Sequence, residues 1–162
     1  MAVSLLRNIK IQHLTVDGSN YLLTAGTTDD SNGSIVDTLG YGNVTWLVAF
    51  GDNTATGVAT FKVQQSNDVG GAPDDFSDVA GSSVAVTCAA ADYDYACVAI
   101  EVNNPVKRYL RLCLNRATAN IVVSSVFAIL GGASATPITQ SASAGQFVKT
   151  VKYLDAPAEG TP

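Results

Sequence analysis

Hydrophobic and polar residues alternate along much of this 162-residue chain. The clearest runs are residues 58–65 and 108–115, in which every second side chain is hydrophobic. A β-strand sends alternate side chains to opposite faces, so this period predicts strands with one buried face. Further strands are expected at residues 8–16, 45–50, 83–88, 97–102 and 121–130. In the first of these the period slips at His13, which predicts a β-bulge there.

Turn-forming residues separate these runs, and residues typical of helices are scarce. Residues 29–33, 51–53 and 67–73 are rich in Gly, Asn and Asp, whereas the chain has a single Met and only two Glu. Short strands at intervals of about 10–15 residues are typical of an antiparallel sandwich. We therefore expect an all-β fold, an antiparallel β-sandwich of jelly-roll type.

The C-terminal part of the chain differs in character from the rest. Residues 132–162 are rich in Ser, Ala and Gly, whereas the strand-like pattern occupies residues 1–131. We expect a β-sandwich domain followed by an extended arm or terminal strand. Phe147, Val148 and Tyr153 are the arm's candidate contact residues.

Composition narrows the classes of partner. The net charge is −5, which disfavours direct contact with nucleic acid, because such proteins use Lys and Arg to neutralise phosphates. No apolar run approaches the ~20 residues of a membrane helix. Only 14% of the residues are charged and 47% are hydrophobic. This combination indicates either a well-filled core or apolar surface that is covered by other subunits.

The residues that usually carry catalysis or bind metals are few. His13 is the only histidine, and no Gly-x-Ser-x-Gly motif occurs. The cysteines Cys88, Cys97 and Cys113 lack zinc-site spacing, and their odd number favours free thiols. The acidic residues near positions 30, 75 and 93 fit solvated loops rather than a calcium motif. We expect no enzymatic activity, no cofactor and no metal.

Two groups of residues are candidates for surface contacts. Lys107, Tyr109 and Arg111 would share one strand face, where they could pair with acidic groups of the same or a neighbouring subunit, or touch nucleic acid. Trp46 and Tyr41 could form a sugar-stacking platform, but a role in the core or at an interface is more typical of aromatic residues.

Two segments resemble a known protein family. Residues 61–68 (FKVQQSND), followed by 76–79 (FSDV), and residues 105–112 (PVKRYLRL) resemble small virion proteins of tailed bacteriophages. The resemblance extends over about residues 44–140, and its motifs are structural rather than chemical. It implies a protein made in the host cytoplasm and located in the virion.

The same segments also resemble discoidin-type jelly rolls, in which a VQxSxDG strand precedes an RYxRL strand. Here Val69 replaces the glycine that normally follows Asp68, and Phe76 stands where an aromatic residue is expected. Discoidin domains often bind sugars or lipids through loops, but this sequence has no matching aromatic-tipped loop.

The virion resemblance implies a capsid decoration (cement) protein on the outer surface of the head. Its partners would be the major capsid protein and further copies of itself, with a trimer as the favoured state. A head–tail joining or tail protein is the alternative within the virion, and a discoidin-type carbohydrate-binding module is the alternative outside it.

Overall fold

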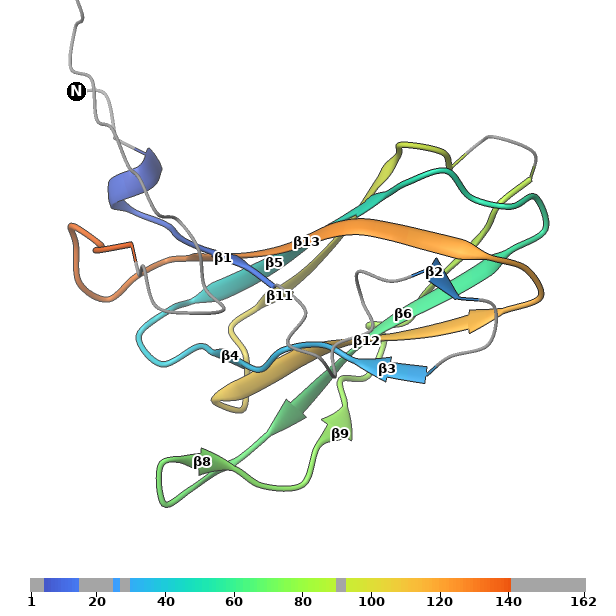
Figure 1. The fold of residues 1–162 in the computed structure, drawn as a ribbon. Helices are drawn as coiled ribbons and strands as arrows, with labels where there is room; N and C mark the ends of the chain where they lie inside the picture. Colours follow the sequence, from blue (N-terminus) through green and yellow to red (C-terminus); the bar gives the residue numbers. More distant parts are fainter. Residues whose placement is uncertain (1–4, 15–24, 27–29, 90–92, 141–162) are drawn as a thin grey trace, which may run out of the picture.

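The computed structural model describes residues 5–14, 25–26, 30–89 and 93–140, and it shows the expected all-β sandwich (Figure 1). The first sheet has the order β1 (Lys10–His13), β13 (Ile121–Gly131), β5 (Asn43–Phe50), β11 (Cys97–Asn103), and β2 (Ala25–Gly26) also pairs with β13. The second sheet has the order β10 (Val84–Thr87), β6 (Val58–Ser66), β12 (Tyr109–Ala117), β3 (Asp30–Asn32). At its margins β4 (Val36–Asp37) pairs with β12 and β9 (Ser77–Asp78) pairs with β6.

All of these pairings are antiparallel, and the chain alternates between the two sheets as in a jelly roll. A small hairpin of β7 (Asp68–Val69) and β8 (Ala72–Pro73) projects beyond β6. One 3-10 turn, η1 (Leu5–Arg7), precedes β1. Within the described residues, no helix is long and apolar enough to cross a membrane.

The core lies between the sheets and follows the sequence pattern where that pattern is strict. In β12, Leu110, Leu112 and Leu114 are buried, and in β6, Phe61 and Val63 are fully buried opposite them. The register pairs Leu112 with Val63 and Leu114 with Phe61. The two segments that carry the family resemblance therefore meet where residues 61–66 of β6 lie beside residues 109–112 of β12.

The expected bulge at His13 is wrong. Strand β1 pairs with β13 without a register shift, and the irregularity lies in β13 between Val123 and Ser125. The strand keeps its two-residue period by burying Gln12, which is 2% exposed, while Ile11 and His13 face outward and stay half-buried. The apparent slip arises because hydrophobic residues occupy both faces of this strand.

After β13 the chain returns to the N-terminal edge of the first sheet. The Ile138 N–H donates to the Arg7 carbonyl at 2.9 Å. The Gln140 side-chain amide donates to the carbonyls of Leu6 and Ile9 and accepts from the Ile11 N–H, at 3.1, 2.7 and 3.1 Å. Of the predicted arm, residues 132–140 are thus described and return to the sandwich domain, whereas residues 141–162, with the candidate contacts Phe147, Val148 and Tyr153, lie outside the described residues.

Candidate functional site

The two sheets differ in the chemistry of their outer faces. The outward side chains in the middle of the first sheet form what we call the apolar face: Ile11, His13, Thr45, Leu47, Ala49, Cys97, Ala99, Glu101, Ser125, Phe127 and Ile129. The polar pair Asn43 and Asn103 borders this face at one end. Glu101, on the edge strand, is the single charged member of this set. Exposed sheet faces normally carry polar side chains, so an almost uncharged one marks a contact surface.

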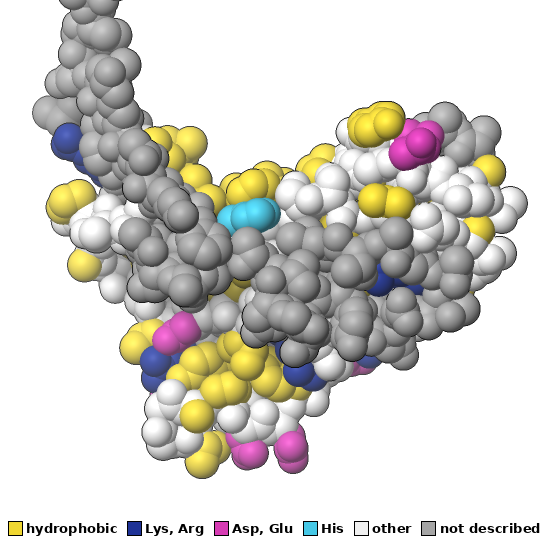
Figure 2. Space-filling model, in the orientation of Figure 1, with side chains coloured by type: hydrophobic (Ala, Val, Ile, Leu, Met, Phe, Trp, Pro, Cys, Tyr) yellow, Lys and Arg dark blue, Asp and Glu magenta, His cyan; other side chains and the backbone are white. Residues whose placement is uncertain are grey.

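The centre of the apolar face is a row that runs across all four strands. The register places His13 beside Phe127, Phe127 beside Leu47, and Leu47 beside Ala99. The imidazole of His13 lies against the Phe127 ring, with a centroid distance of 4.8 Å, and Phe127 is 36% exposed. In Figure 2 the histidine is cyan and lies next to yellow hydrophobic side chains on the upper side of the molecule. His13 thus contributes to an apolar surface.

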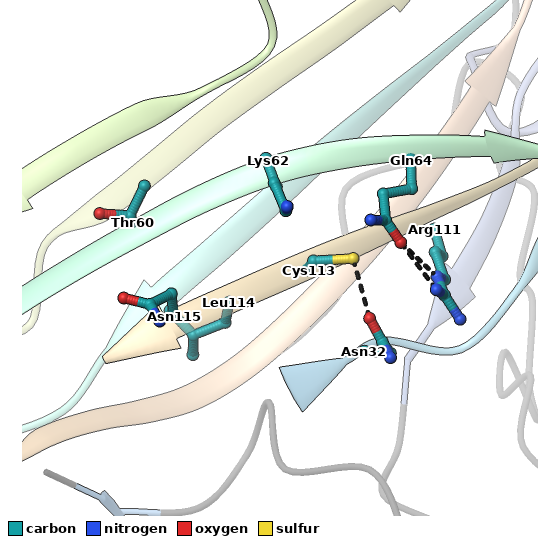
Figure 3. Close-up of a pocket in the computed structure, with 8 residues that line it drawn as sticks. All are labelled: Asn32, Thr60, Lys62, Gln64, Arg111, Cys113, Leu114 and Asn115. Carbon is teal, nitrogen blue, oxygen red and sulfur yellow. Dashed lines mark hydrogen bonds between the residues drawn. The ribbon is translucent and has the colours of Figure 1, made fainter. Parts of the chain in front are cut away.

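The outer face of the second sheet is polar and hollowed. A cavity of about 500 Å³ is lined by Asn32, Thr60, Lys62, Gln64, Arg111, Cys113, Leu114 and Asn115 (Figure 3). We call it the polar hollow. Its lining comes from β3, β6 and β12 and includes two cations and no carboxylate. The hollow is therefore a positively charged spot on an acidic protein.

A chain of hydrogen bonds holds the cations of the hollow. Lys62 Nζ donates to Asp78 Oδ2 at 3.1 Å, and Gln64 Nε2 donates to Asp78 Oδ1 at 2.8 Å. Arg111 donates to Gln64 Oε1 through Nε and Nη2, at 2.9 and 2.7 Å. The hydrogen bond from Gln64, followed by that from Lys62, holds the pKa of Asp78 below its usual value, so this carboxylate stays charged and anchors the group.

The thiols give no sign of reactivity where they are buried. Burial raises the pKa of Cys113, whose Sγ donates to Asn32 Oδ1 at 3.1 Å within the hollow. Burial likewise raises the pKa of Cys88 in the core. Cys97 is free and exposed on the apolar face. In the part of the chain that the structure describes, no group of three or more His, Cys, Asp or Glu side chains could hold a metal ion.

The basic segment pairs with acids of its own chain, through a residue outside the predicted trio. Arg108 donates to both carboxylate oxygens of Asp37, at 2.9 and 2.7 Å, and also binds Asp68. The hydrogen bonds that Asp37 accepts from Arg108 hold the pKa of this carboxyl below its usual value. Lys107 lies 3.5 Å from the Ser77 hydroxyl, and Arg111 lines the hollow.

Two of the predicted contact residues are not available on the surface. Trp46 is fully buried in the core, so it provides no sugar-stacking platform; the core alternative is the correct one. Tyr109 is 5% exposed, and its hydroxyl donates to the Gly71 carbonyl at 2.8 Å. Trp46 faces the core from β5. Tyr109 lies on the opposite side of β12 from the core residues Leu110 and Leu112, where the β7–β8 hairpin covers it.

Asn53 is a structural residue that the sequence did not reveal. It is 7% exposed, its Oδ1 accepts from the Val122 N–H at 2.7 Å, and its Nδ2 donates to the Tyr93 carbonyl. Its own N–H donates to Asp94 Oδ1. In the sequence it appears only as a turn residue after a strand.

The chain was also compared with known proteins. No protein-family model matches it, and no curated protein does. Among solved structures, Eiger TNF from S. frugiperda is similar over 83% of this chain and 99% of that chain, with 10% sequence identity and a TM-score of 0.42. A similarity at this level carries no inference about function.

Proposed function

We propose that this chain is a structural protein of a tailed-bacteriophage particle, a decoration protein that acts by adhesion at the outer surface of the head and has no catalytic role. The phage setting is supported by the resemblance of two segments, which contribute residues 61–66 to β6 and residues 109–112 to β12. The adhesive role is supported by one observation above all, the apolar face of the first sheet.

The occupant of the apolar face is a second copy of this chain. Each copy carries a net charge of −5, so two copies repel one another most weakly where they present uncharged surface. The apolar face has Glu101 as its single charge, and this residue lies on the edge strand. Burial of Phe127, Leu47 and their neighbours then provides the attraction.

The size of the face indicates that the contact extends beyond it. Four strands about 4.8 Å apart and five residues of about 3.4 Å each cover roughly 20 by 17 Å, or about 340 Å². A stable interface buries about 800 Å² on each partner. The adjoining surface is the backbone edge of β11, which forms the outer edge of the first sheet among the described strands. Unpaired strand edges bind further chains readily. We therefore propose that face and edge act together.

The association can be tested with a charge placed in the centre of the face. Phe127→Glu should reduce the oligomer to a monomer in light scattering, whereas Val69→Glu should not. Val69 is a matched control because it is 59% exposed and lies on the β7–β8 hairpin, away from the face. Ala99→Lys, on the edge, should weaken association to an intermediate degree.

Each variant should keep the far-ultraviolet circular dichroism of the parent chain, because the changed side chains face outward. Equal oligomerisation of Phe127→Glu and the parent would overturn the proposed interface. A monomeric parent chain at micromolar concentration would do the same.

A further inference from the structure

We propose that the polar hollow of the second sheet binds an acidic saccharide unit, that is, a sugar ring that carries a carboxylate. This inference does not depend on the proposed virion role, since it follows from the hollow alone. The lining residues that matter are Arg111, Lys62 and the side-chain amides around them.

Arg111 is held in place before any ligand arrives. Its guanidinium carbon lies 4.0 Å from the centre of the Phe76 ring, and its Nε edge is fixed by two bonds to Gln64 Oε1. Gln64 is in turn fixed by Asp78. A side chain that is already ordered loses little entropy when it binds, so it favours affinity.

The remaining edge of this guanidinium can bind a carboxylate. Arginine has five N–H donors, and Gln64 uses one on Nε and one on Nη2. The Nη1 and Nη2 donors that remain form the fork that matches a carboxylate with two parallel hydrogen bonds. In the described residues no carboxylate lies within ion-pair distance of Arg111, unlike Arg108 and Lys62.

The rest of the lining suits a hydroxylated ring. Asn32, Asn115 and Thr60 can both donate and accept hydrogen bonds, as sugar hydroxyls do. In Figure 3 the side chains of β6 and β12 stand in two rows, with the Asn32 side chain beside Cys113. The volume of about 500 Å³ falls in the range of small-molecule sites and exceeds the need of a bare inorganic anion.

The hollow differs from the sugar site that the sequence predicted. That site would have used Trp46, which is in the core, and Tyr41, which packs against the core. Recognition here depends on charge and hydrogen bonds rather than on stacking. Neutral sugars should therefore bind poorly.

Titration of the full chain followed by amide NMR tests the proposal. Glucuronate should cause saturable shifts at the amides of Lys62, Arg111 and Cys113, and glucose at the same concentrations should not. Arg111→Met should weaken glucuronate binding about tenfold or more, since it removes a charge-assisted pair. Lys62→Gln is a second variant with the same expected direction. Lys107→Gln is the matched control, because Lys107 lies outside the lining.

The other outcomes overturn the proposal in distinguishable ways. Equal binding of inorganic phosphate and glucuronate would refute the saccharide and leave only an anion site. Equal binding of glucose would refute the role of charge. No saturable shift at tens of millimolar glucuronate, or undiminished binding by both folded variants, would refute the site altogether.

Discussion

The Gln140 side chain makes the hydrogen bonds that a neighbouring strand would make at the β1 edge of the first sheet. Its amide donates to the Leu6 and Ile9 carbonyls and accepts from the Ile11 N–H. The backbone groups of successive strand residues point to alternate sides. The Leu14 N–H donates to the Val126 carbonyl and so points toward β13. The Ile9 carbonyl and the Ile11 N–H therefore point to the other side of β1, away from β13. Replacement by alanine should therefore release the edge of the sheet.

The size of the effect follows from three lost hydrogen bonds. Each contributes about 0.5–1.5 kcal/mol net, and water replaces part of it because the site is only partly buried. We expect Gln140→Ala to lower the free energy of unfolding by about 1–2 kcal/mol. With a urea dependence of about 2 kcal/mol/M, the unfolding midpoint should fall by about 0.5–1 M. Gln140→Glu should lower it at least as much, because a carboxylate cannot donate to the Leu6 and Ile9 carbonyls.

Urea unfolding and hydrogen exchange of the Ile11 amide measure the effect. Thr139→Ala is the control, since Thr139 is exposed and lies next to Gln140 in the sequence. The Ile11 amide should exchange faster in Gln140→Ala than in the control. If the urea midpoint and the exchange rate of the Ile11 amide are both unchanged, the Gln140 hydrogen bonds do not stabilise β1.

Three further changes test other parts of the fold. Asn53→Ala should lower the free energy of unfolding, measured in urea, by about 2–3 kcal/mol, because the Val122 N–H and the Tyr93 carbonyl lose Asn53 as a partner. A decrease below about 0.5 kcal/mol would contradict this role. Gly132→Ala should lower the melting temperature by several degrees, since Gly132 has a φ of +61° and its Cβ would lie 3.3 Å from the Gly42 backbone; an unchanged melting temperature would argue against this. Because the pKa of Asp37 is lowered in the folded chain, its pairing with Arg108 stabilises the fold above about pH 4 and is lost as the pH falls through the lowered pKa. Arg108→Met should therefore flatten the loss of stability below pH 4 in urea midpoints measured against pH, and an identical acid slope in both proteins would refute the contribution of this pair.

The sequence predicts those strands well that have one hydrophobic and one polar face. Phe61 and Val63 in β6, and Leu112 and Leu114 in β12, alternate with polar residues, so the inward side is unambiguous. Strand β1 defeats the same reasoning because Ile11 is hydrophobic but faces outward, while Gln12 is buried. The outward hydrophobic residue that breaks the pattern, Ile11, is a member of the apolar face.

The candidate surfaces depend on register, which the sequence does not determine. The polar hollow exists because Arg111 pairs with Gln64 and Cys113 pairs with both Lys62 and Asn32. These residues come from three strands that are far apart in the chain. Likewise the alternation of β5 identifies a strand but does not say whether Trp46 faces the core or the outside. Only the assembled sandwich decides these questions.

Counting the copies of this chain in purified particles tests the central claim most directly. Under the proposed virion role, the copies are counted against the major capsid protein, by quantitative gel or mass spectrometry, in particles of the phage or prophage expected to encode the chain. A decoration protein should be present in hundreds of copies and should be reached by antibodies on the outer surface of intact heads. A count of about six or twelve would instead indicate a ring at a single vertex, as a head–tail joining protein forms. That count, or the absence of the chain from the particle, would contradict the account.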